Sequence, residues 1–331
     1  MIHPIPPGTR DILPDEMREL RRLELALLDV FETRGYGQVA TPAIEYDEVL
    51  ARGDGRTAAT AYRFFDERGD LLALRTDMTV PIARLVASRF ASAEPPLRFS
   101  YLANAYRAVR PQRGQMREFT QAGIELIGAP APGGTVEVIE MLTAALDAAG
   151  LDRAVIGLGD ADLYRQLLSE LGVEDEETRE GVLQRLAAHD LVGLEAALEE
   201  VDGIGSEQAA TCLALSQLRG GKEVLERARG IGGDAVDRAT ARLGETYEAL
   251  EARGVADRVR IDLGLLRDLG YYSGAILEVY DPALGHVLGG GGRYDGLLRR
   301  FGVDLPAAGF ALYVERVHLA QLEEESRRGE R

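Results

Sequence analysis

Apolar residues near the N-terminus recur at helical spacing. Leu20, Leu23, Leu27 and Phe31 follow one another in steps of three and four residues, which places their side chains on one face of a helix. The pattern predicts an amphipathic helix over 15–34, whose apolar face packs in the core or against a second copy of the chain.

Other segments show shorter apolar runs bounded by turn residues, the pattern of β-strands. The strands predicted in this way are 37–40, a hairpin over 62–75, 97–107, 119–127, 155–158, 259–266 and 275–280. Helical spacing predicts further helices over 79–90, over 134–149 and from about Val314. The run Gly289–Gly292 is interpreted as a tight bend beside the sheet, because no lysine of a phosphate-binding loop follows it.

The pattern changes in the middle of the chain, where helical runs rich in Ala, Leu and Glu alternate with glycines and no convincing strand is present. The sequence therefore divides into a first core part at 1–160, an all-helical insertion at 161–253, a second core part at 254–320 and a charged tail at 321–331, which is predicted to be disordered. Tight turns between strands favour an antiparallel sheet. The predicted fold class is α+β, an antiparallel sheet flanked by helices and split by the insertion.

The composition narrows the possible functions. Acidic residues outnumber basic ones by 55 to 38, and the net charge of −17 is unfavourable for binding tRNA. No stretch of eighteen apolar residues is present, so we expect no membrane span. Cys212 is the only cysteine and lies in an apolar run, which predicts a core position in a cytoplasmic protein without disulfides. We expect neither a metal nor a cofactor.

Polar side chains interrupt three otherwise apolar segments. These side chains are Arg75, Asp77 and Thr79 in the first segment, Arg107, Gln121 and Glu125 in the second, and Arg267, Tyr271 and Tyr272 in the third. Gln121, Gly123 and Glu125 alternate, so on a strand all three face the same side of the sheet. A carboxylate and an amide on one face of a central strand are costly unless they find partners.

Two interpretations of these polar residues stay open from the residues alone. Carboxylates for an α-ammonium group, arginines for an α-carboxylate and phenols for a polar ring suit a zwitterionic ligand. The same residues also suit structural ion pairs that cross the sheet. The pattern does not identify the ligand.

The order of six motifs goes further than the single residues. GTRDILP, LRTDMT, the segment from Arg107 to Glu125, LLRDLGYYSG, GGGGRYDGLL and GFALYVER together resemble the histidyl-tRNA synthetases, a class II aminoacyl-tRNA synthetase family, over essentially the whole chain. The region around Pro42 resembles the family's dimerisation motif 1, 99–125 resembles motif 2 and 309–316 resembles motif 3.

The resemblance implies a histidine-binding pocket. Asp77, Thr79, Gln121 and Glu125 would hold the α-ammonium and neighbouring groups, and Arg107 corresponds to the motif 2 arginine that grips the carboxylate. Arg267 corresponds to the catalytic arginine of the synthetases. Tyr271 and Tyr272 would line the imidazole.

The departures from the synthetase pattern concern ATP and tRNA. Val109 replaces a glutamate that fixes the adenine of ATP, and valine accepts no hydrogen bond. Tyr313 replaces a small glycine and is expected to fill nucleotide space. Asp268 and Gly270 exchange the usual glycine and aspartate of the signature. The chain also ends shortly after motif 3, where we expect no anticodon-binding domain.

A chain that keeps the histidine-binding residues of the synthetases but lacks those that bind ATP resembles the synthetase-like regulatory subunits of ATP phosphoribosyltransferase. This resemblance implies a non-catalytic subunit, required for the first step of histidine biosynthesis, with L-histidine as its feedback effector. Its partner would be the short-form ATP phosphoribosyltransferase catalytic subunit, bound by a homodimer within a hetero-oligomer, and no tRNA would bind. One alternative is a truncated, active histidine-adenylating enzyme, and another is a dimerisation scaffold with a vestigial pocket.

Overall fold

A computed structural model describes residues 4–109, 116–188, 190–201, 204–231, 233–267, 270–282 and 284–329. Most of the arginine-rich loop of motif 2 and the exchanged residue Asp268 lie outside the described residues.

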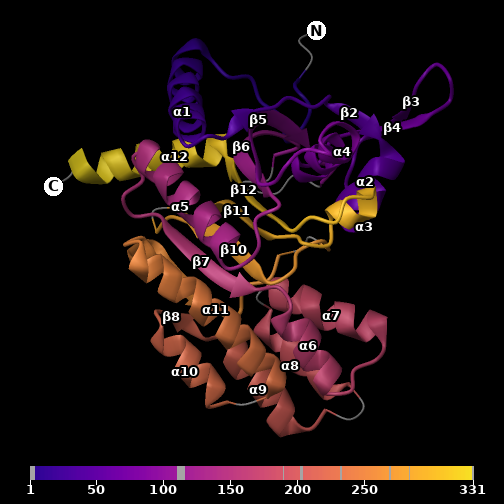
Figure 1. Cartoon of the computed structure of the whole chain (residues 1–331), viewed down its shortest axis with the longest axis vertical. Coiled ribbons are helices and arrows are strands. Elements are labelled where there is room, and N and C mark those ends of the chain that lie inside the picture. The colour runs from indigo at the N-terminus through magenta and orange to yellow at the C-terminus, as the bar shows by residue number, and fades with distance from the viewer. Residues whose placement is uncertain are drawn as a thin grey trace.

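A nine-stranded sheet forms the centre of the molecule (Figure 1). Its order is β1 (Gly37–Gln38), β5 (Leu97–Tyr106), β6 (Glu118–Ile127), β12 (Ala307–Tyr313), β11 (Val287–Arg293), β10 (Ala275–Tyr280), β7 (Val155–Asp160), β9 (Val259–Asp262) and β8 (Arg219–Gly220). Only the pairs β1–β5 and β7–β9 are parallel among the described strands, so the prediction of a mainly antiparallel sheet is confirmed. A smaller sheet has the order β2 (Ile44–Tyr46), β4 (Leu71–Leu74) and β3 (Arg63–Phe65).

Two separate apolar cores lie against the large sheet. The first contains the apolar faces of α1 (Pro14–Thr33), α5 (Gly133–Ala148) and α12 (Val314–Gly329). The second contains those of α2 (Asp47–Gly53), α4 (Thr79–Arg89) and the short turn η2 (Leu298–Phe301), beside which lies α3 (Gly55–Ala59). Ile124 and Leu126 of β6 belong to the first core, so Gln121, Gly123 and Glu125 face the second side because strand side chains alternate.

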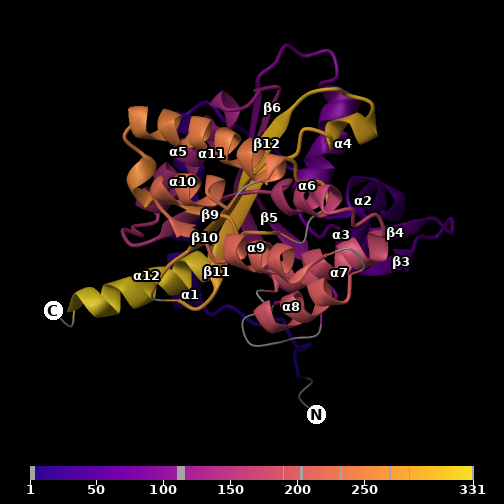
Figure 2. The same ribbon diagram turned by 90° about the horizontal axis from the view of Figure 1, so that it is seen from below.

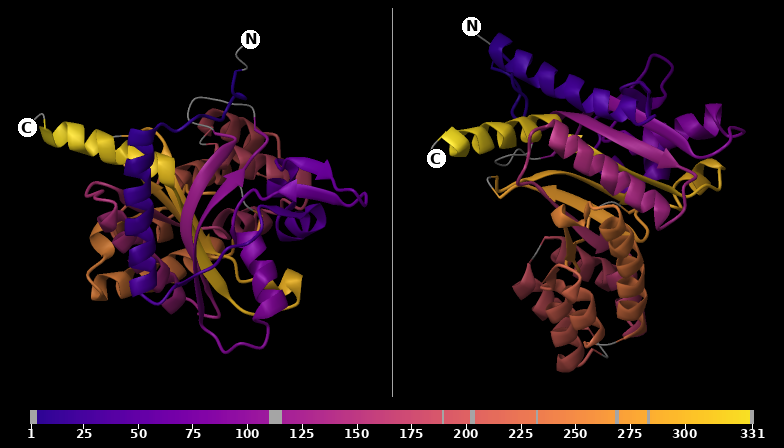
Figure 3. Two further views of the ribbon diagram at one scale, coloured as in Figure 1. Left: turned by 90° about the horizontal axis from the view of Figure 1, so that it is seen from above. Right: turned by 60° about the vertical axis from the view of Figure 1, so that its left-hand side comes forward.

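The predicted insertion is a lobe of helices at the end of the molecule away from α1 and α12 (Figures 1 and 3). It contains α6 (Leu163–Glu170), α7 (Glu176–Ala187), α8 (Leu191–Glu199), α9 (Ser206–Ser216), α10 (Glu223–Arg229) and α11 (Asp234–Ala252), and Figure 2 shows it from below. Cys212 is buried there, as its apolar run predicts.

The expectation that no strand is present between 161 and 253 is wrong in one place. The two-residue strand β8 extends the large sheet by pairing with β9, and the amide of Leu263 donates to the carbonyl of Leu218 beside it. Two residues are too few to show any periodicity. The strand predicted over 259–266 correspondingly ends at Asp262, where the chain enters a turn.

The glycine run is a strand and not a bend. Gly289–Gly292 lie within β11, between β10 and β12. A Cβ added at Gly291 would lie 2.0 Å from the carbonyl oxygen of Gly309, and one at Gly289 would lie 2.4 Å from that of Ala311. Glycine is needed here because the neighbouring backbone lies too close for a side chain.

The charged tail is also ordered further than predicted, because α12 continues to Gly329. The carboxylate of Glu324 is buried and accepts a hydrogen bond of 3.1 Å from the amide of Arg153. The amide of Gln321 donates to the carbonyl of Ala149 at 2.7 Å. Polar residues that indicate disorder by composition therefore attach this helix to the chain after α5. The other predicted helices and strands have counterparts with slightly shifted ends.

Candidate functional site

The structure brings the predicted site residues together on the sheet face opposite α1. All of them except Glu125 line one small cleft, called here the polar cleft. Its lining consists of Asp77, Thr79, Tyr101, Arg107, Gln121, Arg267, Tyr271, Tyr272, Gly290, Tyr294, Gly309, Phe310, Ala311 and Tyr313. Segments as far apart in the chain as Asp77 and Tyr313 thus form a single site.

Glu125 lies beside the polar cleft and contacts its wall. Its buried carboxyl accepts a hydrogen bond of 2.8 Å from the hydroxyl of Thr79, and a second from the hydroxyl of Tyr294. A Cβ added at Gly309, the residue opposite Glu125 on β12, would lie 2.1 Å from this carboxyl. Burial raises the pKa of Glu125 to about 8, against the opposing effect of both hydroxyls. The carboxyl therefore holds its proton at neutral pH.

Three buried polar atoms of the cleft residues have no hydrogen-bond partner among the described residues. They are Oδ2 of Asp77, Oε1 of Gln121 and Nε of Arg267. Asp77 is 6% exposed and Gln121 is 3% exposed, so solvent hardly reaches them. Buried polar groups in folded proteins nearly always have partners. Two unpaired acceptors and one unpaired donor in one cleft indicate a ligand with both kinds of group.

Asp77 also has a local structural role. Its other carboxylate oxygen accepts a hydrogen bond of 3.1 Å from the amide of Val80 in the first turn of α4, where free N–H groups need acceptors. Burial raises the pKa of Asp77, although this hydrogen bond and the charge of Arg107 oppose the shift. Asp77 is thus held in a fixed orientation by one oxygen and has the other free.

The two arginines of the polar cleft are held by backbone carbonyls. Nε of Arg107 donates to the carbonyl of Thr76 at 3.2 Å, and its guanidinium lies 5.1 Å from the centre of the Phe119 ring. Nη1 of Arg267 donates to the carbonyl of Leu277 at 3.3 Å and lies 3.8 Å from Glu278. Both guanidiniums have donors left for an anionic group.

Aromatic rings form another wall of the cleft. The rings of Tyr271 and Tyr272 lie 4.9 Å apart, and the ring of Tyr294 meets that of Tyr271 edge-on at 5.8 Å. The sequence pattern does not indicate Tyr294, because it lies two residues after the glycine run that was interpreted as a bend. It is the hydrogen-bond donor to Glu125 that no local pattern indicates.

The space enclosed by the polar cleft is only about 30 Å³. This is room for one or two water molecules, so the cleft as it stands does not enclose an amino acid. The cleft therefore combines polar groups that suit an amino acid with a space smaller than one.

Arg75 has a structural role and does not line the polar cleft. Its guanidinium donates to the carbonyls of Asn104 and Thr41, each at 2.7 Å. These two bonds join β5 to the chain before β2. Arg75, Asp77 and Thr79 lie in one polar segment of the sequence, and their spacing alone does not separate a backbone support from a ligand contact.

A larger cavity of about 390 Å³ adjoins the polar cleft and is called here the arginine cavity. Its lining consists of Arg10, Arg107, Val109, Met116, Phe119, Leu284, His286, Tyr313, Glu315, Arg316 and Leu319. Arg107 and Tyr313 line both spaces. The guanidinium of Arg316 lies 4.5 Å from the centre of the Tyr313 ring. Val109 and Tyr313, the two departures from the synthetase pattern that concern the ATP site, thus lie in one cavity.

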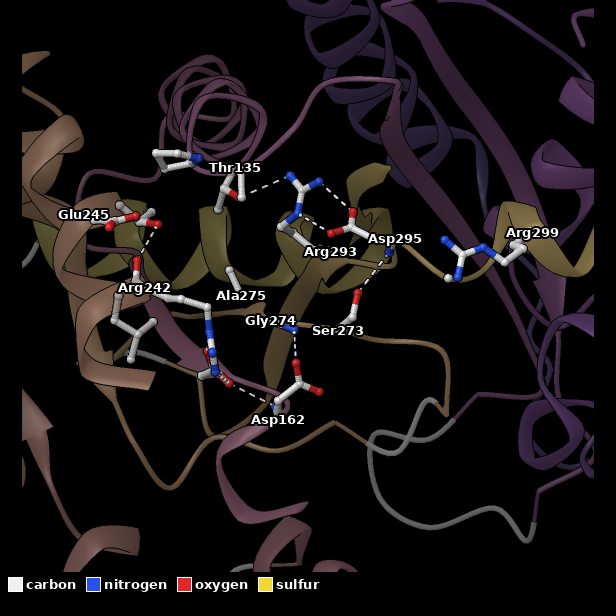
Figure 4. A pocket seen from close by; sticks show the side chains of 16 residues that line it. Thr135, Asp162, Arg242, Glu245, Ser273, Gly274, Ala275, Arg293, Asp295 and Arg299 are labelled. Carbon is white, nitrogen blue, oxygen red and sulfur yellow. Dashed lines mark hydrogen bonds and ion pairs between the residues drawn. The ribbon is translucent and has the colours of Figure 1, made fainter. Parts of the chain in front are cut away.

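A third cavity, of about 370 Å³, lies where the insertion meets the core (Figure 4). We call it the joint cavity. Arg242 of α11 binds the buried carboxylate of Asp160 by two hydrogen bonds of 2.9 and 3.0 Å. Arg293 binds Asp295 at 2.6 Å, and the amide of Gly274 donates to Asp162 at 3.1 Å. No residue that lines this cavity has an unpaired buried side-chain atom within the described ranges.

The described part of the chain contains no group of three or more histidine, cysteine or acidic side chains placed to bind a metal ion. Its helices include none with the length and apolar character that crossing a bilayer requires.

Known proteins resemble this chain over almost its whole length. The family model "Histidyl-tRNA synthetase" matches residues 8–317. An ATP phosphoribosyltransferase regulatory subunit of Moorella thermoacetica is 43% identical over 320 residues, which are 96% of this chain and 82% of that protein. The corresponding protein of Symbiobacterium thermophilum is also 43% identical, over 96% of this chain and 79% of the relative.

Solved structures of the same family also match this chain. A Bacillus halodurans structure described as an ATP phosphoribosyltransferase regulatory subunit/histidyl-tRNA synthetase has a TM-score of 0.86 at 32% identity and covers 97% of this chain and 84% of that one. A histidyl-tRNA synthetase of Nostoc is 21% identical with a TM-score of 0.80, over 98% of this chain and 76% of that one, and shows the fold alone. The chain therefore belongs to the histidyl-tRNA synthetase family, within its branch of ATP phosphoribosyltransferase regulatory subunits.

Proposed function

We propose that this chain is the regulatory subunit of an ATP phosphoribosyltransferase and binds free L-histidine in the polar cleft. The observation that carries the histidine site is the group of buried, unpaired atoms on Asp77, Gln121 and Arg267. The regulatory role is supported by the names of relatives that are 43% identical to this chain. The chain itself would make no covalent change to its ligand.

The donors and acceptors of the cleft match the groups of histidine. The α-ammonium group would donate to Oδ2 of Asp77 and Oε1 of Gln121. The α-carboxylate would accept from Arg107 and from Arg267. The imidazole would lie against the paired rings of Tyr271 and Tyr272, whose faces suit a flat ring with polar edges.

Glu125 adds an electrostatic consequence to this arrangement. Its carboxyl is protonated at neutral pH and joined to the cleft through Thr79. A bound ammonium group nearby favours the ionised carboxylate. Histidine binding at pH 7 should therefore release a proton from the protein, which is measurable as a dependence of the binding enthalpy on the buffer.

The contracted volume of the cleft provides a route to regulation. Because about 30 Å³ does not hold an amino acid, the histidine-bound state must differ in structure from the empty one. A ligand that binds one arrangement better shifts the assembly toward it. In a homodimer bound to short-form ATP phosphoribosyltransferase catalytic subunits, this shift would favour an inhibited state, and the substrate of the catalytic subunit would in turn alter histidine affinity.

The test is a calorimetric titration of the whole chain with L-histidine, alone and mixed with a short-form catalytic subunit. We expect saturable binding, and inhibition of the transferase reaction in the mixture by histidine. No binding in either sample would overturn the histidine site. A mixture whose transferase activity equals that of the catalytic subunit alone would overturn the regulatory role.

A second measurement addresses the adenylating alternative. Histidine-dependent exchange of pyrophosphate into ATP requires a seated adenine, and Val109 supplies no acceptor for its amino group. We expect no exchange. Measurable exchange would favour a truncated histidine-adenylating enzyme over the regulatory subunit.

A further inference from the structure

Tyr313 occupies the boundary between the polar cleft and the arginine cavity. It is the last residue of β12, lies opposite Gln121 in the sheet register and lines both spaces. Its side chain is neither fully buried nor exposed. A side chain in this position separates what lies in the cleft from what lies in the cavity.

Contacts on several sides hold the Tyr313 ring in place. The ring of Phe119 meets it edge-on at 5.4 Å, and the guanidinium of Arg316 lies over its face at 4.5 Å. The phenol of Tyr313 also lies beside Arg107, whose positive charge lowers the pKa of Tyr313. Arg107 is itself fixed, by its bond to the carbonyl of Thr76 and by its position over Phe119.

This geometry places the phenol where a ligand carboxylate would compete with it. Arg107 is the arginine to which the proposed function assigns the α-carboxylate, and in this structure the Tyr313 phenol interacts electrostatically with that guanidinium. A free carboxylate is the stronger acceptor and displaces a neutral hydroxyl. A group attached to the carboxyl carbon, however, would have to pass the Tyr313 ring toward the arginine cavity.

We propose that Tyr313 is the specificity-determining residue of the polar cleft: its hydroxyl holds Arg107 until a free α-carboxylate replaces it, and its ring excludes amino acids extended at the carboxyl group. This inference rests on the proposed histidine site. It names the ligand class as the free α-amino acid, in contrast to peptides, esters and other acyl derivatives of the same amino acid.

The charge of the phenol adds a pH dependence. Burial raises the pKa of Tyr313, but Arg107, Arg267 and Arg316 outweigh burial and lower it to about 8. Above this pH the phenolate pairs with Arg107 and competes more strongly with the ligand, so histidine affinity should fall as the pH rises through about 8. The groups that interact with the phenol are Arg107, Arg267, Arg316, Tyr101 and Tyr272.

The experiment compares L-histidine with the dipeptide L-histidylglycine, which keeps the ammonium, the imidazole and a negative charge but extends the carboxyl end. Calorimetry at pH 7 should show that the unchanged chain binds histidine at least about tenfold more tightly than the dipeptide. Tyr313→Ala opens the boundary and should reduce this ratio by about tenfold. An unchanged ratio in Tyr313→Ala, or a dipeptide that binds the unchanged chain as well as histidine does, would overturn the inference.

Tyr313→Phe separates the ring from the hydroxyl and covers the case in which the alanine variant does not fold. It should still exclude the dipeptide, should bind histidine about threefold more tightly at pH 7, and should lose the fall in affinity above about pH 8. A histidine affinity and pH profile equal to those of the unchanged chain would show that the hydroxyl does not hold Arg107.

Tyr280→Phe is the matched control, because Tyr280 lies on β10 and lines neither space. It should retain the pH profile of the unchanged chain, including the part that comes from histidine's own ammonium group, so a profile altered in Tyr313→Phe alone is due to the Tyr313 phenol. Failure of the unchanged chain to bind histidine would count against the proposed function. Histidine binding with selectivity unaltered by either Tyr313 variant would count against this inference alone.

Discussion

The polar cleft and the joint cavity are both lined by arginines and carboxylates, but their charged groups differ in pairing. In the joint cavity, Asp160 receives two hydrogen bonds from Arg242, and Arg293 is bound to Asp295. In the polar cleft, Asp77 and Gln121 each keep a buried acceptor without a partner among the described residues. The joint cavity is a structural connection between the insertion and the core, whereas the cleft lacks groups that a ligand would supply.

The polar cleft is the better candidate for a ligand site by its unpaired groups, but the joint cavity is the larger of the two spaces. The joint cavity encloses about 370 Å³ and the polar cleft about 30 Å³, so of these two a search by size alone would choose the joint cavity. Unpaired buried atoms are the better guide here, because leaving a buried polar group unpaired costs about 1–3 kcal/mol. We expect a folded protein to keep an unpaired buried polar group where another interaction, such as ligand binding, offsets this free-energy cost.

The largest effect is expected for Asp77→Asn. The amide keeps an oxygen that accepts from the amide of Val80, so α4 should be unaffected. It removes the negative charge that faces the proposed ammonium group, and a hydrogen bond to a charged group contributes about 1.5–3 kcal/mol. Histidine affinity, measured by calorimetry at pH 7, should fall by about 10- to 100-fold. An affinity within about twofold of the unchanged chain would refute the assignment of Asp77.

Arg242→Gln should lower the stability of the fold and leave histidine binding unchanged, the reverse of Asp77→Asn. It leaves the carboxylate of Asp160, which is 2% exposed, without its cationic partner. Since the Arg242 side chain is 39% exposed, solvent screens the pair, and we expect the free energy of unfolding to fall by about 2 kcal/mol. Histidine affinity should not change.

Arg299→Gln is the control for this second effect. Arg299 lines the same cavity, but it and its partner Asp304 are mostly exposed, so urea denaturation should show almost no change. Equal losses of stability in the two variants, or weaker histidine binding in Arg242→Gln, would remove the distinction between the joint cavity and the cleft.

The next effect is a pH dependence of stability caused by Glu125. Burial raises its pKa from 4.5 to about 8 in the folded chain, while the unfolded chain loses the proton near 4.5. The folded state therefore binds more protons between these values, and its stability falls as the pH rises through this window and levels off above it. Glu125→Gln carries no titrating proton, so its stability relative to the unchanged chain should rise from pH 5 to pH 8. Urea denaturation at both pH values measures this difference, and a constant difference would contradict the raised pKa.

Much of the fold could be predicted from local patterns, since β5, β6, α1 and α4 follow their alternating or helical spacing closely. The errors occur where a residue type has two physical uses. Gly289–Gly292 indicate a bend by conformational freedom, but they form a strand because neighbouring backbone leaves no room for Cβ atoms. Glu324 indicates a disordered tail by its charge, but it binds the amide of Arg153.

The sequence predicts which residues form the candidate site better than it predicts the contacts between them. The alternation of Gln121 and Glu125 predicts a shared face, and the resemblance to synthetases adds Arg107 and Arg267; their histidine-binding roles stay predictions. The contact between Tyr294 and Glu125 joins residues 169 positions apart, and no local pattern encodes such a pair. The small volume of the cleft is likewise a property of packing, which depends on every wall at once.

The smallest expected effect tests the comparison most directly. Gln121→Leu replaces an amide whose Oε1 is buried and unpaired by an apolar side chain of similar size. Removing an unsatisfied polar atom should raise the free energy of unfolding without ligand by about 1 kcal/mol. The same change removes an acceptor for the ammonium group, so histidine affinity should fall by about tenfold.

A gain in stability together with a loss of binding is the signature of a group retained for a ligand. Arg293→Leu, the corresponding polar-to-apolar change in the joint cavity, should instead lower stability, because it takes the partner from Asp295 and frees the hydroxyl of Thr135. If Gln121→Leu also lowered the stability of the chain without ligand, the amide would have a partner in the folded protein. The unpaired atoms of the cleft would then carry no information about a ligand.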